Sequence, residues 1–331
     1  MKKLLSLALA LILVLSMSTV AFAADYESSL DKGTTFTKEY VVTHGTAPAE
    51  TFDFTVEYKS FKNNEGVEVE TSSYPTVTLG DAEFANALTA TGSANVSVAI
   101  SNYDNVALGV YTYQINEVVP TPKTAGTTYN IDPVYLVVTI LRSEDSAKHY
   151  VAAIHYETAS GAKTGKISNS YDAGQLSVTK KIEGNMADMT EKFEFTVVFT
   201  PAEGTAFNTA VQIANDAAST NRTYTATANQ DGTYTVKFEL GNAETATFTN
   251  IPVGTTYTVD ENSEEYVKKN TAVADGVIVG GDEDKSEWLN TLDSTIDTGI
   301  SMDSLPYVLM LAVAFVGLAV IVSKKRMARD F

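Results

Sequence analysis

Two ordered sets of lysine, glutamate and asparagine have the residue types for a reaction between their own side chains. The sets are Lys38, Glu117 and Asn169, and Lys180, Glu261 and Asn290. Each member shares strand parity with apolar neighbours, as Lys38 does with Phe36 and Tyr40. If these segments are regular strands, the polar side chains point inward with the apolar ones. An unpaired buried lysine or glutamate is costly, so each needs a partner or a chemical purpose.

Burial would give these side chains a specific chemistry. In an apolar core a lysine loses its proton more easily, and a carboxyl group keeps its proton more easily. A neutral lysine is a nucleophile, and asparagine offers it an amide carbon. A protonated glutamic acid would hydrogen-bond the amide, polarise its carbonyl and relay protons. The attack would release ammonia and leave a Lys–Asn amide bond, driven mostly by proximity in the folded core.

Ordinary interpretations compete with this one. A lysine such as Lys38, taken alone, is more often a solvated charge, and Asn169 or Asn290 alone would be a turn residue. An ordered triple at matching parity, found twice, favours the covalent interpretation. Lys181, beside Lys180, has the opposite parity and serves as an internal control.

The elements that must position these residues are strands almost throughout. Apolar and polar residues alternate in four segments, 52–58, 111–115, 193–199 and 233–238. This period of two, rich in Thr, Val, Tyr and Phe, is typical of half-buried strands, and turn signals such as Asp231-Gly232 separate them. Many short strands with polar turns predict an all-β fold of β-sandwich domains. A short helix or loop is expected at Phe207–Ala218.

The chain repeats its design once. Corresponding segments are Phe36–Tyr40 with Leu176–Lys180, Phe52–Val56 with Phe193–Val197, Tyr113–Glu117 with Tyr257–Glu261, and Ile167–Asn169 with Trp288–Asn290. The boundary between the repeats falls near Asp172–Gly174. We therefore expect two tandem Ig-like sandwich domains, residues 24–172 and 173–291.

The N-terminus has the pattern of a signal peptide. Lys2 and Lys3 precede a largely apolar run over Leu4–Leu15, and Ala21-Phe22-Ala23 places small residues where signal peptidase requires them. Residues 1–23 are therefore predicted to be removed on export. The alternative is a buried or membrane helix.

The C-terminal segment, residues 292–331, combines a Thr-Gly pair, an apolar span and a basic tail. The 18 residues of Leu305–Val322 have the minimum length for a transmembrane segment, and the basic tail that follows holds the end on the cytoplasmic side. This order resembles a sortase cell-wall sorting signal. The resemblance implies that a sortase attacks the Thr298 carbonyl and releases Gly299 onward. The family motif Leu-Pro-any-Thr-Gly is only partly present, which leaves the sortase class open, and a permanent membrane anchor is the alternative.

Composition excludes several classes of function. The 331-residue chain has no Cys, so disulfides, thiol catalysis and cysteine zinc sites are excluded. Its three His have no ligand spacing, and we predict no metal and no cofactor. Without residues 1–23 and 299–331 the chain keeps 17 basic and 39 acidic residues, a net charge of −22, which disfavours nucleic acid as a partner. No Ser-His-Asp arrangement or phosphate loop indicates an enzyme.

The Lys, Glu and Asn sets resemble those of self-generated isopeptide bonds in Gram-positive pilin and adhesin domains. The first unit resembles the isopeptide domain of streptococcal major pilins, also in Thr127-Thr128-Tyr129 followed by Tyr135–Ile140. The second unit resembles the related Cna-B-type domain. The resemblance implies two cross-links, each promoted by the glutamate of its set: Lys38–Asn169 with Glu117, and Lys180–Asn290 with Glu261.

Together these patterns predict a major, or backbone, pilin: a structural subunit that a sortase polymerises covalently on a Gram-positive cell wall. The acceptor of Thr298 would be Lys163, six residues before Asn169, with Lys166 as second choice. Implied partners are the sortase, identical subunits, peptidoglycan, minor pilins and host surface ligands. The alternative is a monomeric wall-anchored adhesin or minor pilin that binds host or matrix ligands. Either protein would be extracellular, with transient membrane anchoring before sorting.

Overall fold

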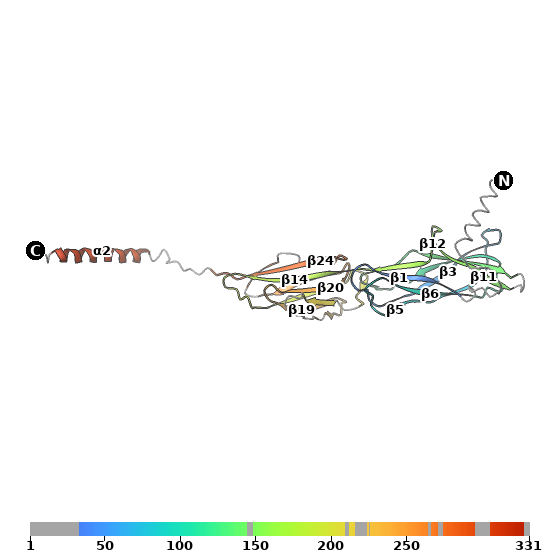
Figure 1. The fold of residues 1–331 in the computed structure, drawn as a ribbon, viewed down its shortest axis with the longest axis horizontal. Coiled ribbons are helices and arrows are strands. Elements are labelled where there is room, and N and C mark those ends of the chain that lie inside the picture. Colours follow the sequence, from blue (N-terminus) through green and yellow to red (C-terminus); the bar gives the residue numbers. More distant parts are fainter. Residues whose placement is uncertain are drawn as a thin grey trace, which may run out of the picture.

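The computed structural model describes residues 33–143, 148–208, 212–215, 224, 226–263, 266–270, 274–294 and 305–327. The predicted signal peptide, residues 1–23, and the predicted cleavage pair Thr298 and Gly299 lie outside these described residues. Two sandwich units follow one another along the chain and lie end to end (Figure 1).

The first unit packs two five-stranded sheets against each other. One sheet has the order β4 (Thr76–Leu79), β6 (Gly92–Ser101), β1 (Thr34–Val42), β13 (Lys166–Tyr171), β9 (Thr127–Thr128). The facing sheet has the order β12 (Lys163–Thr164), β11 (His149–Thr158), β10 (Val134–Arg142), β7 (Gly109–Glu117), β3 (Phe54–Lys62). The core between them includes the fully buried Tyr40, Tyr111 and Leu136.

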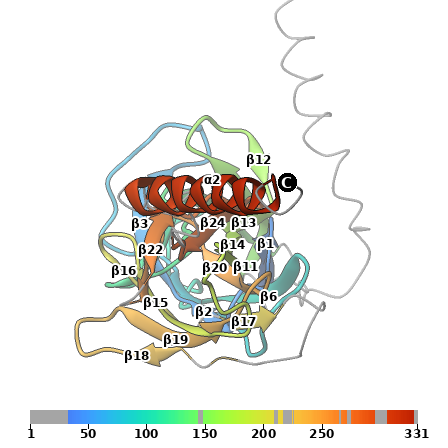
Figure 2. The ribbon, with the colours of Figure 1, turned by 90° about the vertical axis from the view of Figure 1, so that its left-hand side faces the viewer.

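The second unit repeats this plan with its own core around Phe195, Phe199 and Phe248. One sheet has the order β17 (Gln212–Asn215), β20 (Thr245–Pro252), β14 (Ala173–Glu183), β24 (Glu283–Thr291), β22 (Val267–Asn270). The other has the order β18 (Thr227–Ala228), β19 (Tyr234–Leu240), β15 (Phe193–Thr200), β21 (Thr256–Asn262), β23 (Asp275–Val277). Figure 2 shows β15, β18 and β19 as a layer beneath β14, β20 and β24.

The strands form where the sequence alternates between apolar and polar residues. In β7 the side chains of Tyr111, Tyr113 and Ile115 are buried, while the residues between them are partly exposed. This alternation places one face of each strand on the core and the other toward solvent. The predicted all-β fold is confirmed.

The prediction of a helix or loop at Phe207–Ala218 is wrong where the structure describes that segment as a strand. Gln212–Asn215 forms β17, the edge strand of its sheet, which pairs with β20 and places Ile213 opposite Phe248. Residues 209–211 and 216–218 lie outside the described residues. Pairing with a neighbouring strand supplies backbone hydrogen bonds that no local pattern in this short segment indicates.

The two units are joined with almost no intervening chain. Two short pairs of strands lie outside the four large sheets. In the first unit β2 (Glu50–Phe52) pairs with β5 (Ala82–Phe84), and between the units β8 (Lys123–Thr124) pairs with β16 (Thr205–Ala206). β13 ends at Tyr171 and β14 begins at Ala173, while β8 and β16 pair in parallel between the units. Asn250 also accepts from the Thr46 N–H at 2.7 Å and donates to the Thr46 carbonyl at 3.0 Å. The junction is thus held by both backbone and side-chain contacts.

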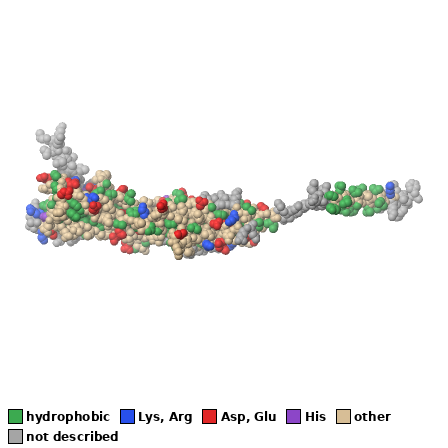
Figure 3. Space-filling view, turned by 180° about the vertical axis from the view of Figure 1, so that it is seen from behind, with side chains coloured by type: hydrophobic (Ala, Val, Ile, Leu, Met, Phe, Trp, Pro, Cys, Tyr) green, Lys and Arg blue, Asp and Glu red, His purple; other side chains and the backbone are tan. Residues whose placement is uncertain are grey.

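Helix α2 (Leu305–Met327) is the helix nearest the C-terminus among the described residues. Its large apolar side chains from Tyr307 to Val322 are exposed, and they cover much of its surface in Figure 3. Within the described part of the chain, no helix meets the length and apolarity needed to span a membrane. The transmembrane segment 305–322 therefore stays a prediction.

Candidate isopeptide sites

The strands that carry the lysine and the asparagine of the first unit are parallel neighbours. β1 pairs with β13, with Lys38 opposite Ile167 and Tyr40 opposite Asn169. Because side chains alternate between the two faces of a strand, Lys38 and Asn169 project from the same face of the sheet. They are offset by two residues, so they lie diagonally across the pair of strands.

The second unit has the same register. β14 and β24 are parallel neighbours, with Lys180 opposite Trp288 and Ile182 opposite Asn290. Lys180 and Asn290 therefore share a face at the same two-residue offset. The internal repeat found in the sequence is thus also a repeat of strand direction and register.

The glutamates come from the facing sheets. Glu117 ends β7 and lies opposite Phe54 of β3, and Glu261 lies in β21 opposite Phe195 of β15. Each glutamate therefore reaches across the core toward the lysine and asparagine on the other sheet. In both units the sandwich, and not the local chain, brings the three side chains together.

In the first unit the three side chains are in direct contact. Lys38 Nζ lies 2.5 Å from Glu117 Oε2, and both side chains are fully buried. Asn169 Nδ2 donates a hydrogen bond to Glu117 Oε1. Lys38 Nζ also lies 4.5 Å from the centroid of the Phe52 ring. Burial lowers the pKa of Lys38, while the hydrogen bond that Lys38 donates to Glu117 acts in the opposite direction.

In the second unit the same three types of side chain meet. Lys180 Nζ lies 2.6 Å from Glu261 Oε1, and both side chains are fully buried. Asn290 Nδ2 donates to the same Glu261 oxygen at 2.9 Å, and Lys180 Nζ lies 4.3 Å from the centroid of the Phe193 ring. Burial lowers the pKa of Lys180, with Glu261 acting in the opposite direction.

This arrangement brings together the three groups that an amide transfer needs: an amine, an amide and a carboxyl group that can carry protons between them. Each lysine is held where the neutral, nucleophilic amine is favoured by burial. Each glutamate contacts both the amine and the amide nitrogen of its site, so it lies on the path that a proton must follow. The residues predicted from the sequence are therefore brought together at both sites.

The two sites differ at the asparagine carbonyl. Asn169 Oδ1 accepts a hydrogen bond from the backbone N–H of Asn130 at 2.8 Å. Among the residues that the structure describes, Asn290 Oδ1 and Glu261 Oε2 are buried without a hydrogen-bond partner. Lys180 Nζ and Glu261 Oε1 form a close ion pair, but their geometry is not that of a hydrogen bond.

Sequence reasoning missed Glu50, a second carboxylate beside the first site. Its Oε1 accepts hydrogen bonds from the Tyr129 hydroxyl and, at 3.0 Å, from Thr124 Oγ1, and its Oε2 accepts from the Tyr40 hydroxyl at 3.3 Å. Burial raises the pKa of Glu50. The signal that could have found it is parity, because Glu50 lies two residues before the buried Phe52 on the same strand.

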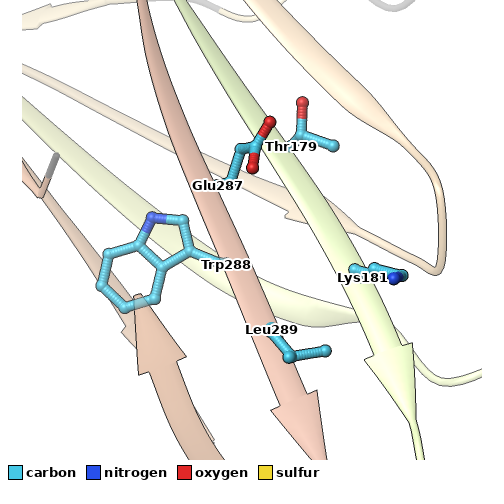
Figure 4. Close-up of a pocket in the computed structure, with 5 residues that line it drawn as sticks. All are labelled: Thr179, Lys181, Glu287, Trp288 and Leu289. Atoms are coloured by element: carbon cyan, nitrogen blue, oxygen red, sulfur yellow. The ribbon is translucent and has the colours of Figure 1, made fainter. Parts of the chain in front are cut away.

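Lys181 lies on the outer face of the second unit, as its parity predicts. Its side chain is 65% exposed and pairs with Glu183. Figure 4 shows it on β14 beside β24, where a shallow pocket is lined by Thr179, Lys181, Glu287, Trp288 and Leu289. Lys181 has no part in the buried site.

The two candidate acceptor lysines of the first unit differ in their partners. Lys166 Nζ forms an ion pair with Glu39 at 2.8 Å, although its side chain is 57% exposed. Lys163 is exposed on the two-residue edge strand β12, and no ion pair to it is found among the described residues. Lys163 is therefore the less constrained amine of the two.

No group of three or more His, Asp or Glu side chains that could hold a metal ion occurs in the described part of the chain. His44 Nδ1 instead contacts Asp172 Oδ1 at 2.9 Å beside the junction of the units. On the face shown in Figure 3, acidic and basic side chains are scattered over both units.

Comparison with known proteins finds pilins among the proteins that this chain resembles. A family described as "Domain of unknown function (DUF7601)" matches residues 174–292, which is the second unit. A protein named Pilin from Streptococcus pyogenes serotype M1 is 26% identical over 254 residues, covering 71% of this chain and 74% of that protein.

Solved structures show the same fold. The major pilin from Streptococcus pyogenes is 21% identical, with a TM-score of 0.52, over 78% of this chain and 98% of that one. The major pilin T3.2 from Streptococcus pyogenes serotype GAS13637 is 18% identical, with a TM-score of 0.50, over 80% of this chain and 99% of that one. The predicted resemblance to a streptococcal-type major pilin is therefore confirmed, and the all-β, multi-domain architecture is the fold of those pilins.

Proposed function

We propose that this chain is a structural subunit of a covalently polymerised cell-surface pilus, stabilised by one Lys–Asn isopeptide bond in each unit. The observation that carries the proposal is the duplicated buried contact of lysine, glutamate and asparagine between parallel first and last strands. Similarity to a protein named Pilin supports the same function.

The reaction would proceed in the same way at both sites. One proton passes from Lys38 Nζ to Glu117 along their 2.5 Å contact, which gives a neutral amine and a neutral acid. The amine attacks the Asn169 amide carbon and forms a C–N bond. Glu117 delivers its proton to the amide nitrogen, the old C–N bond breaks and ammonia leaves, and the Glu117 carboxylate then takes the extra proton from the former Lys38 nitrogen to leave a neutral amide. Each site reacts once, so the chain is not an enzyme.

The product would allow a chain without cysteine to resist force and proteases. Each bond joins the strand that begins a unit to the strand that ends it. A load entering at Lys163 would pass along β13 directly into β14, and would cross covalently from Lys180 to Asn290 of β24 on its way to Thr298. Strands between the linked ones would then remain folded under tension.

Polymerisation would use one lysine of the first unit and one threonine of the C-terminal segment. Thr298 would be passed by the sortase to the Lys163 amine of the next subunit, or to peptidoglycan for the last subunit added. The exposure of Lys163 and its lack of an ion pair among the described residues support it over Lys166. The apolar sequence within α2 would hold the chain in the membrane until cleavage, which would make the mature protein extracellular.

Intact-mass measurement of the purified, folded chain tests the cross-links. The expected mass is lower than the calculated mass by two ammonia molecules, and peptide mapping should recover Lys38–Asn169 and Lys180–Asn290 as linked peptides. Full mass in a well-folded chain would contradict the proposal.

A cell-wall extract boiled in detergent tests polymerisation. We expect a ladder of multimers that is abolished by Lys163→Ala and kept in Lys166→Ala. Loss of the ladder only in Lys166→Ala would exchange the two assignments. A single wall-linked band in the unaltered protein would instead indicate the monomeric adhesin or minor pilin.

A further inference from the structure

Formation of the Lys38–Asn169 bond requires a hydrogen-bond donor at the Asn169 carbonyl oxygen, and Glu117 does not supply it. When Lys38 Nζ attacks the amide carbon, the carbonyl electron pair moves onto Asn169 Oδ1, which becomes an oxyanion. The two oxygens of Glu117 are engaged with Lys38 Nζ and Asn169 Nδ2. A separate donor is therefore needed at the oxygen.

The donor already in place is the backbone N–H of Asn130, at 2.8 Å from Asn169 Oδ1. Fixed donors aimed at an oxygen that gains charge stabilise the transition state without reorganisation. We propose that this N–H is the oxyanion donor for the bond, and that Glu50, acting through Tyr129, is the positioning residue that holds it there. This inference rests on the proposed isopeptide function.

Two sets of contacts fix the segment that carries Asn130. On one side, β9 pairs with β13, with Thr128 opposite Ser170, the residue after Asn169. On the other side, the hydroxyl of Tyr129 donates to Glu50 Oε1. Because Tyr129 directly precedes Asn130, anchoring the tyrosine limits how far the N–H can move from the carbonyl.

Glu50 itself is held from several directions. Thr124 Oγ1 donates to its Oε1 at 3.0 Å, and the Thr124 N–H donates to the Tyr129 hydroxyl at 3.3 Å. Tyr40, two residues after Lys38 on β1, donates to Glu50 Oε2 at 3.3 Å. A partly buried carboxylate with this set of donors acts as a clamp between β1, β2 and the segment before Asn130.

The second unit offers a natural comparison. Among its described residues, no group donates to Asn290 Oδ1. The two sites share their residue types and strand register, but Lys180 and Asn290 contact the same Glu261 oxygen, whereas Lys38 and Asn169 contact different oxygens of Glu117. We therefore expect the first bond to form faster than the second in the same molecule. The rate of the second bond then serves as an internal reference for variants that alter the first.

The test measures the rates of both bonds in one chain. The full chain is synthesised in a cell-free system, folding is followed by resistance to protease, and linked peptides are quantified over time. Tyr129→Phe keeps the ring but removes the hydroxyl, and should slow the first bond about tenfold while the second keeps its rate, as expected for an indirect loss of one oxyanion donor.

Two further pairs of variants separate positioning from general stability. Glu50→Ala should slow the first bond as Tyr129→Phe does, whereas Glu50→Gln keeps an oxygen acceptor and should restore the rate. Asn130→Pro removes the N–H and should slow the first bond about a hundredfold, whereas Asn130→Ala keeps the N–H and should not.

Each outcome decides the inference. An unchanged first-bond rate in folded Tyr129→Phe and Glu50→Ala would overturn it, even if Asn130→Pro failed to fold. Equal slowing of both bonds would also overturn it, because a local donor affects one site only. If neither bond forms in the unaltered chain, the proposed isopeptide function itself fails, and that result is distinct from the others.

Discussion

The two units contain the same buried contact of lysine, glutamate and asparagine but surround it differently. The register of the parallel strands, the glutamate from the facing sheet and the phenylalanine ring beside the lysine are common to both. The partner of the asparagine carbonyl is not, since Asn169 Oδ1 has the Asn130 N–H and Asn290 Oδ1 has no partner among the described residues. The shared features are those that the proposed amide transfer requires, and the feature that differs would affect the rate of that reaction.

Loop length does not distinguish the units. The first bond would close a loop of 131 residues, from 38 to 169, and the second a loop of 110, from 180 to 290. In the chain-entropy model both closures stabilise the folded unit by about 5 kcal/mol. Differences between the units must therefore come from their sites.

The largest expected effect is on stability. Asn169→Ala and Asn290→Ala should each lower the free energy of unfolding of their own unit by about 5 kcal/mol and leave the other unit unchanged. The single tryptophan, Trp288, is buried in the second unit. Its fluorescence in a denaturant titration should therefore shift in Asn290→Ala only, while circular dichroism reports the loss in Asn169→Ala.

Lys181→Ala is the matched control, because this lysine adjoins Lys180 but is exposed. It should change stability by less than about 0.5 kcal/mol, as surface substitutions usually do. A loss in Lys181→Ala as large as in Asn290→Ala would show that general damage to β14, and not the missing bond, causes the effect.

An intermediate effect should appear in the pH dependence of the unlinked variants. In Asn290→Ala, burial lowers the pKa of Lys180 in the folded chain below the ordinary lysine value of 10.5. Between the two values only the unfolded chain binds the proton, so stability should rise with pH in this window. Each unit of pKa difference corresponds to about 1.4 kcal/mol.

Denaturant midpoints measured below the pH at which tyrosines ionise would test this. Asn169→Ala should behave similarly, because burial also lowers the pKa of Lys38. The linked chain should lack this contribution, since an amide nitrogen does not titrate. A flat profile in both variants, matching the linked chain, would contradict burial as the source of the lowered lysine pKa.

The smallest expected effect concerns the rings beside the lysines. Phe52→Leu and Phe193→Leu remove the aromatic face near Nζ. At a pH below the window in which the folded lysine loses its proton, the loss should be about 0.5–1 kcal/mol larger in the unlinked variants than in the linked chain, because only a charged amine gains from the ring. A double-mutant cycle in each unit measures this difference, and a zero coupling energy would rule out the interaction.

The sequence predicted most of the buried site because the alternation of residues along a strand already shows which side chains share its buried face. Lys38, Lys180 and their partners stand among apolar residues of the same parity, and the sheets bring those faces together. Glu50 shows the same signal on a strand of three residues, which is too short for a pattern to be convincing.

The donor at Asn169 had no signal in the sequence at all. A backbone N–H is present at every residue except proline, so only the tertiary position of Asn130 makes it special. Strand β17 was missed for a similar reason, because its pairing with β20 is set by the neighbouring strand and not by its own residues.

The junction between the units has a consequence for rotation about the long axis. Only Asp172 separates β13 from β14, and its N–H donates to the Gly126 carbonyl at 3.0 Å. With the Thr46–Asn250 pair and the β8–β16 pairing on the same joint, neither unit can swivel without breaking hydrogen bonds. A torque on one unit is therefore transmitted to the other, so that the faces of the two units keep a constant angle within each chain.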